Sequence, residues 1–265
     1  MNIRRTYETL FAKRVLVLPK LQFFRKQGIV LLYPYLLWSV VQGGIMLIMS
    51  KYTNGGLTTL EFLMIPLDPF GQFWYLYDLF FIYILYYFIR IKTDDSFILV
   101  ISILLFILAP YFEIWEFSRI FNHFVFFALG SIFLDIQEFF CKKFAKSVFI
   151  YIYISFLLTL LFSFMIGIER LEFFFAGLLG TISVIYMSKQ ISQLSVLQYI
   201  GQNSLPIYLW HILSIVLFRV VLIKMLKINS SFILIIVMTG MGILVPLFID
   251  KLVNKLNISK MVYGK

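Results

Sequence analysis

Cysteine, histidine and charged residues are all scarce in this sequence. The single cysteine, Cys141, excludes an internal disulfide and any metal cluster built from several thiolates. Only 14% of the residues are charged, whereas soluble domains carry about 25%. With 62% hydrophobic residues and a mean hydropathy of +0.95, the chain has too little polar surface for an ordinary soluble domain. These shortages predict an integral membrane protein.

The sequence has no low-complexity linker and no periodic repeat. Its first 26 residues are too long and too basic to predict a cleavable signal peptide. Its first residues are rich in Lys and Arg, and we expect them to lie in the cytosol against anionic lipid headgroups. We therefore divide the chain into a basic cytosolic segment (1–27), a single transmembrane domain (28–252) and a basic cytosolic tail (253–265).

Long apolar runs are abundant. Eight of them approach the ~20 residues that a helix needs to cross ~30 Å of hydrocarbon. The predicted spans are 28–49, 72–90, 96–112, 119–136, 147–167, 171–189, 204–225 and 231–250. The fold class that we expect is all-α, a polytopic bundle of about eight transmembrane helices in a lipid bilayer.

The basic residues indicate how the bundle is oriented. If the N-terminus is cytosolic, most of the 23 Lys and Arg fall in cytosolic stretches, as the positive-inside rule requires. An even number of spans then places both termini in the cytosol. This distribution accounts for the net charge of +10 without a nucleic-acid partner.

One stretch combines turn, helix-start, aromatic and ionisable signals, and it is Tyr199–His211, YIGQNSLPIYLWH. A turn ending at Asn203 is followed by Ser204, which we predict to be the N-cap of a helix. Pro206 then falls in the first turn, where its missing N–H costs nothing. An apolar run of about five turns follows.

Ser204, Tyr208 and His211 stand at i, i+4 and i+7, which places them on one face of that helix. An ionisable group inside a spanning helix usually faces a cavity or a partner. His211 is therefore either a functional group or a structural histidine with satisfied hydrogen bonds.

Other costly side chains occur in the predicted spans. Asp78 is either part of a polar site or a structural ion-pair partner, with Arg219 as the candidate partner. Trp74 either lines that site or belongs to an interfacial aromatic belt. Arg219 either pairs or extends outward to water, and His123 is predicted to be an interfacial histidine.

A pocket lined by histidine, carboxylate and hydroxyl groups would suit acyl transfer. A base must take the proton of an acceptor hydroxyl as it attacks a thioester, and donors must stabilise the oxyanion that develops. Histidine exchanges protons near neutral pH and can be that base. The residues alone favour acyl transfer no more than a transport site.

Four segments resemble motifs of the membrane acyltransferase 3 family, which includes O-antigen, exopolysaccharide and nodulation-factor O-acetyltransferases. Tyr199–His211 is similar to its "GxxSLxIYLxH" signature. Residues 32–38 (LYPYLLW) resemble its "LxPYLxW" helix entry, and residues 73–80 (FWYLYDLF) resemble its "WFLxALF" helix start. Residues 124–130 (FVFFALG) resemble "FxxFxLG".

The resemblance implies a multi-pass O-acyltransferase of the bacterial cytoplasmic membrane. Its donor would be acyl-CoA, with acetyl-CoA expected, its acceptor a cell-surface glycan or lipid-linked glycan, and it would need no metal; a homo-oligomer is possible. His211 is the candidate catalytic residue. The candidate substrate-binding residues are Trp74, Asp78, Asn203, Ser204, Tyr208 and Arg219.

The sequence also departs from the family pattern. The family's first helix carries an arginine and a histidine that is thought to be the base, but this chain is expected to lack the first two transmembrane helices. The family's R-x-x-R pair would fall near 27–31, which reads QGIVL, so Arg25 and Lys26 are the candidate residues for binding acyl-CoA phosphates. Two alternatives stay open: a catalytically incomplete or truncated family relative, and a glycan or lipid transporter or flippase.

Overall fold

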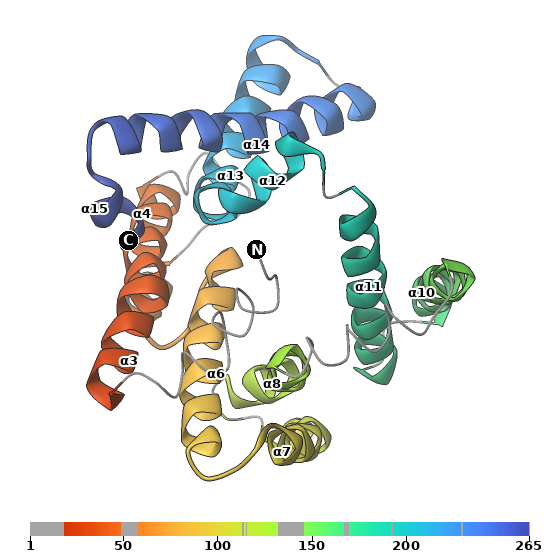
Figure 1. The fold of residues 1–265 in the computed structure, drawn as a ribbon. Helices are drawn as coiled ribbons and strands as arrows, with labels where there is room; N and C mark the ends of the chain where they lie inside the picture. Colours follow the sequence, from red (N-terminus) through yellow and green to blue (C-terminus); the bar gives the residue numbers. More distant parts are fainter. Residues whose placement is uncertain are drawn as a thin grey trace. The chain divides into compact units, whose positions relative to one another are not determined.

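The computed structural model describes residues 19–48, 58–112, 114, 116–131, 146–166, 170–191, 193–228 and 230–264. Over these residues the chain is all-helical and contains no strand, which confirms the predicted fold class (Figure 1). In chain order the elements are α3 (Lys20–Gln27), η1 (Gly28–Leu32), α4 (Tyr33–Ile48), α5 (Thr59–Met64), η2 (Gly71–Phe73), α6 (Trp74–Arg90), α7 (Asp95–Leu108), η3 (Ala109–Tyr111), α8 (Phe117–Ser131), α10 (Lys146–Ile166), α11 (Arg170–Gln190), α12 (Ser195–Gln202), α13 (Ser204–Val220), η4 (Val221–Met225), α14 (Ser231–Lys255) and α15 (Ser259–Tyr263).

Each predicted span coincides with a helix over its described residues. Four described helices are long and apolar enough to cross a membrane, and they are Lys20–Ile48, Gly71–Arg90, Ser204–Met225 and Ser231–Lys255. Shorter apolar helices occupy Ser96–Tyr111, Val148–Leu161 and Phe174–Ser188. The chain is thus a multi-pass membrane protein, while the crossing of all eight segments and the sidedness of the termini stay predictions.

The first long helix begins at Lys20, eight residues before the predicted start of the span. It continues through Gly28, whose backbone is helical (φ −57°, ψ −45°), and widens into the π-helix η1. The widening comes just before Pro34, whose ring would clash with a carbonyl of the preceding turn in a regular α-helix. Arg25 and Lys26 therefore stand on the last turn of α3, within the same continuous helix as the predicted span.

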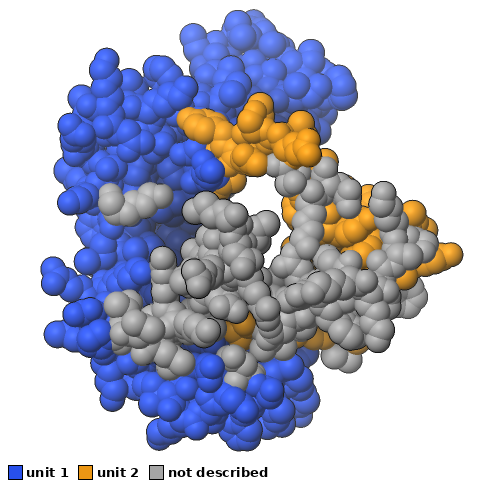
Figure 2. Space-filling view, in the orientation of Figure 1, with its two compact units in different colours: residues 1–128, 202–265 blue, residues 129–201 orange. Residues whose placement is uncertain are grey.

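The chain divides into two compact units, which are described separately (Figure 2). The second unit comprises residues 129–201. In it, α10 packs against α11 through the stacked rings of Phe149 and Tyr186, whose centroids are 3.8 Å apart. Gly180 allows this approach, because a Cβ there would lie 2.9 Å from the ring of Phe156.

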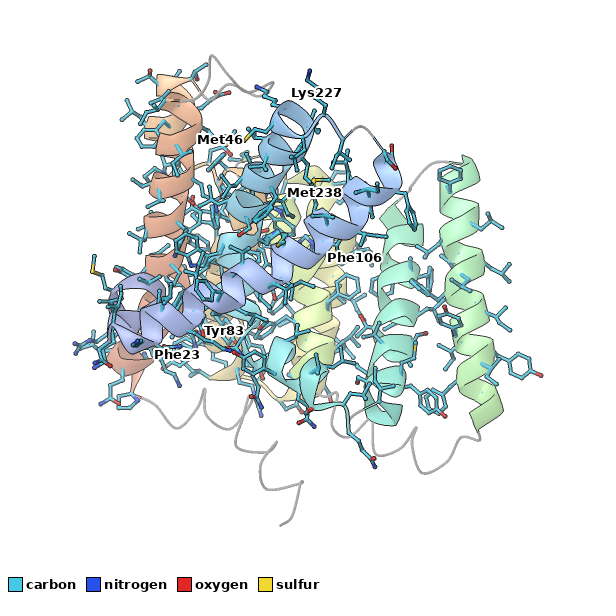
Figure 3. All side chains as sticks on the ribbon, turned by 90° about the horizontal axis from the view of Figure 1, so that it is seen from above. Phe23, Met46, Tyr83, Phe106, Lys227 and Met238 are labelled. Carbon is cyan, nitrogen blue, oxygen red and sulfur yellow. The ribbon has the colours of Figure 1, made fainter. Side chains whose placement is uncertain are left out.

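The first unit comprises residues 1–128 and 202–265 and has two buried clusters. In one cluster α3 meets α6, where Phe23 stacks on Tyr87 with a centroid separation of 4.5 Å. Phe23, in the first turn of α3, is one of the residues labelled in Figure 3. The other cluster joins α4, α6, α13 and α15 around Trp38 and Leu209.

The C-terminal residues are packed rather than free. The last long helix continues to Lys255, and after a left-handed turn at Asn257 the short helix α15 packs against α4. Val253 and Tyr263 are both buried. The residues predicted to form a basic cytosolic tail (253–265) thus include apolar side chains that belong to the core, and their cytosolic location stays a prediction.

Candidate active site

A buried ion pair joins α6 to α8. The carboxylate of Asp78, whose side chain is 2% exposed, accepts hydrogen bonds from both Nε (2.6 Å) and Nη2 (3.1 Å) of Arg119. Arg119 also reaches Glu116, at 3.0 Å. The predicted partner of Asp78, Arg219, was wrong: Arg219 is exposed near the end of α13.

Trp74 and His123 lie next to the Asp78–Arg119 ion pair. The guanidinium of Arg119 is 5.1 Å from the ring centroid of Trp74, and the His123 ring is 5.3 Å from that of Trp74. Trp74 and Asp78 are four residues apart on α6, and Arg119 and His123 are four apart on α8, so each pair shares a helix face. The spacing can be read in the sequence, but nothing in the sequence shows that these two helix faces meet, so Arg119 was missed.

Glu116 is the member of this group outside the apolar helices. Burial raises the pKa of its carboxyl, and the nearby carboxylates of Asp78 and Asp68 raise it further, while Arg119 lowers it. The carboxylates of Asp78 and Glu116 thus both bind the guanidinium of Arg119.

The signature helix α13 begins at Ser204, directly after a turn residue at Asn203. The residues expected to form a turn, Gly201 and Gln202, are the last residues of α12. Asn203 is the N-cap position and makes no side-chain capping bond, so the prediction of Ser204 as the cap was wrong. Pro206 lies buried in the first turn as predicted.

Consecutive residues of α13 are tied to other elements just before His211. The Tyr208 hydroxyl donates to the backbone carbonyl of Gln72. The amide of Gln42, buried in α4, donates to the carbonyl of Leu209 at 2.9 Å and accepts from the Gln72 side chain at 3.0 Å. Sequence reasoning missed both glutamines, although an amide within an apolar helix is itself a signal of a polar partner.

His211 is half-buried, and its ring faces its own helix on one side. Nδ1 lies 2.8 Å from the carbonyl oxygen of Tyr208 and 3.1 Å from that of Ile207. A carbonyl only accepts hydrogen bonds, so Nδ1 carries the proton in the neutral ring and Nε2 holds the free electron pair. His123 has the same arrangement, with its Nδ1 2.8 Å from the carbonyl of Arg119.

Aromatic rings connect the two histidines. The row runs from His123 through Trp74, Tyr75 and Tyr208 to His211, with neighbouring centroids 5.3 to 6.3 Å apart. The structure thus brings together four of the predicted site residues, namely Trp74, Asp78, Tyr208 and His211. Ser204 and Arg219 are exposed, and Asn203 is partly exposed at the start of α13.

The candidate phosphate-binding residues lie elsewhere in the first unit. Arg25 and Lys26 are exposed and form no ion pair within the described part of the chain. Their neighbour Phe24 contacts the rings of Tyr87 and Phe88 on α6. Among the described residues, no group of three or more His, Cys, Asp or Glu could hold a metal ion.

The all-helical fold and its long apolar helices define a class, the polytopic membrane proteins. A family model described as an acyltransferase domain, that of acyltransferase 3, matches residues 10–251. The chain therefore belongs to the acyltransferase 3 family and is a membrane acyltransferase, which confirms the resemblance. Comparisons with curated proteins and with solved structures gave no match.

Proposed function

We propose that this acyltransferase moves an acyl group, most simply acetyl, from acyl-CoA to a hydroxyl of a cell-surface glycan or its lipid-linked precursor at a bacterial cytoplasmic membrane. The observation that supports this most is the row of rings between two histidines, beside the Asp78–Arg119 pair. Binding sites typically combine aromatic walls with a few placed polar groups. Here the rings of Trp74 and Tyr75 offer apolar contact to a sugar ring, and the carboxylate of Glu116 offers an acceptor to its hydroxyls.

His211 is the proposed base. Its Nε2 takes the proton of the acceptor hydroxyl while the hydroxyl oxygen forms a bond to the acyl carbon of the thioester. When the C–S bond breaks, the imidazolium returns that proton to the thiolate of CoA, so the histidine ends neutral. The carbonyls of Ile207 and Tyr208 hold Nδ1 in the protonated form that this role requires.

Arg25 and Lys26 are proposed to capture the phosphates of acyl-CoA. Both are exposed in the last turn of α3, near the position of the family's arginine pair. An arginine and a lysine bind phosphate less rigidly than two guanidinium forks, because the ammonium is a point charge.

The function is tested with the full-length chain in proteoliposomes, supplied with acetyl-CoA and a lipid-linked glycan. Mass spectrometry would follow acetyl transfer to the glycan. Loss of a general base costs about 10²- to 10⁴-fold in rate, so we expect His211→Gln to lose activity on that scale, with exposed Arg219→Gln as the matched control.

Each other outcome of that assay has a distinct meaning. If His211→Gln keeps full activity while His123→Gln loses it, the base is at the other end of the ring row. If the wild-type chain binds acetyl-CoA but transfers nothing to any glycan offered, the proposed reaction is wrong and the chain is a catalytically incomplete relative.

The donor site has its own test. Arg25→Glu combined with Lys26→Glu should weaken acetyl-CoA binding in detergent, and Lys92→Glu, also exposed but on the α6–α7 turn, should not. The wild-type affinity should fall as salt is raised, because the attraction is electrostatic. Equal affinity in the charge-reversed and wild-type proteins would dismiss this site.

A further inference from the structure

We propose that the C-terminal segment Ser259–Gly264 positions the histidine-bearing helix α13, acting through Trp38 and Trp210. The proposal deepens the proposed function, on which its catalytic readout rests. None of these residues belongs to the row of rings that is proposed to meet the substrates, so they would be positioning residues.

The segment is fastened to α4 by specific hydrogen bonds. The Tyr33 hydroxyl donates to the carbonyl of Met261 at 2.5 Å, and the indole Nε1 of Trp38 donates to the carbonyl of Val262 at 3.0 Å. The last carbonyls of any helix lack partners within that helix. Side chains more than two hundred residues away in sequence supply those partners to α15.

A close backbone contact also holds the segment in place. Gly264 has φ +71°, a left-handed conformation that glycine adopts without strain. A Cβ at this position would lie 2.3 Å from the backbone oxygen of Ile29 in η1, so any larger residue must displace the segment from η1 and the start of α4. The adjoining Tyr263 is 1% exposed and packs in the same buried cluster as Trp38 and Leu209.

The contact then extends to the residue before His211. The ring of Trp38 meets that of Trp210 edge to face, with centroids 4.4 Å apart and planes at 73°. Trp210 follows Tyr208 and Leu209, which are tied to Gln72 and Gln42. The C-terminal segment therefore holds the third of three consecutive anchors on α13, and the imidazole comes next.

The end of α14 also packs at the segment. Burial raises the pKa of Tyr263, and the Asp250 carboxylate raises it further. Asp250 is itself buried and accepts from the side chain of Asn254 at 3.0 Å, so the end of α14 is part of the same packed corner.

The test combines hydrogen exchange with kinetics in the full chain. Gly264→Val should displace the segment, and Trp38→Phe, a milder change, removes the N–H donor but keeps a ring. Exchange of backbone amides at residues 208–213 should become about tenfold faster in both, the factor that corresponds to losing one well-placed hydrogen bond. Met261→Ala is the control, because that side chain is 69% exposed.

For acetyl transfer, we expect a lower kcat with little change in the KM of acetyl-CoA, since the base is misplaced and the donor site is untouched. If residues 259–264 exchange faster in Gly264→Val but residues 208–213 do not, the segment holds nothing on α13 and the inference fails. If 208–213 loosen in both variants while kcat is unchanged, positioning for catalysis is wrong. The exchange result stands even if the wild-type protein transfers no acetyl group, so failure of the proposed reaction is distinguishable.

Discussion

At the scale of single residues, the sequence predicted which side chains would be costly in the bilayer, but not how they would be paired. Asp78, His211 and Trp74 stand out from the sequence because of their surroundings. Arg119 did not, because it lies near a helix start where an arginine is unremarkable. Pairing depends on which faces α6 and α8 turn to each other, and one sequence without relatives carries no signal for that contact.

The pairing of Asp78 can be tested with a double-mutant cycle. Removing one partner of a buried ion pair typically costs about 3 to 5 kcal/mol, and the partial exposure of Arg119 places our expectation for Asp78→Asn near the lower end. Asp78→Asn and Arg119→Gln should be strongly non-additive in thermal unfolding. Asp78→Asn and Arg219→Gln should be additive, and coupling there instead would restore the partner that the sequence suggested.

Gln42 provides a second prediction at this scale. Gln42→Leu keeps the volume but deprives the Leu209 carbonyl and the Gln72 side chain of their partner. Leaving such buried groups unpaired costs about 1 to 3 kcal/mol. A drop in melting temperature in detergent would be the measurement. The control Val41→Leu changes an exposed neighbour on the same helix and should melt like wild type.

At the scale of elements, apolar length predicted where helices would form, whereas their ends depended on contacts the sequence does not display. The helix that begins at Lys20 continues through Gly28 because the wider turn of η1 makes room for the ring of Pro34. Ser204 has the composition of a cap, yet α12 extends to Gln202 and takes the place of the expected turn. The short helix α15 contains a few apolar residues only, and tertiary contact with α4 explains its packing.

Two glycines of α14 give a matched test of helix packing. A Cβ on Gly242 would come within 3.2 Å of the side chain of Ile215 on α13, whereas a Cβ on Gly240 meets nothing within 4 Å. We therefore expect Gly242→Leu to lower stability by the 1 to 3 kcal/mol that is roughly typical of overpacking. Gly240→Leu should be neutral or stabilising, because leucine favours helix more than glycine does. Equal melting temperatures for the two variants would contradict the α13–α14 contact.

The stability of the short helix α5 is expected to depend on pH. Thr58 and Glu61 form a capping box, with the Thr58 N–H donating to the Glu61 carboxylate at 2.7 Å and the Glu61 N–H donating to the Thr58 hydroxyl at 3.2 Å. The hydrogen bonds from Thr58 lower the pKa of Glu61. The cap is thus fully present above the usual glutamate pKa and is lost as pH falls through the lowered value. The protection of the α5 amides, which is their exchange rate relative to the intrinsic rate at the same pH, should fall over that acidic range, and Glu61→Gln should abolish this change in protection.

At the scale of the whole molecule, composition predicted a multi-pass membrane protein, and the family match confirms both that prediction and the acyltransferase class. The number of crossings is less directly determined. Ser96–Tyr111 has 16 residues, which at 1.5 Å per residue spans about 24 Å, less than the ~30 Å of a typical hydrocarbon core. Local thinning of the bilayer can accommodate such a helix at modest cost. The distribution of Lys and Arg over the loops favours a crossing, because it predicts an even number of spans.

Labelling with a membrane-impermeant maleimide would decide this crossing. The lone Cys141 allows a clean background, Cys141→Ser, into which Lys92→Cys and Tyr111→Cys are introduced separately. Both positions are exposed, and they flank the short helix. If it spans and the N-terminus is cytosolic, intact cells should label only Tyr111→Cys and inverted vesicles only Lys92→Cys. If both positions react from the same side, the helix does not cross the membrane. With the other seven segments crossing, the number of spans becomes odd and the two termini lie on opposite sides of the membrane.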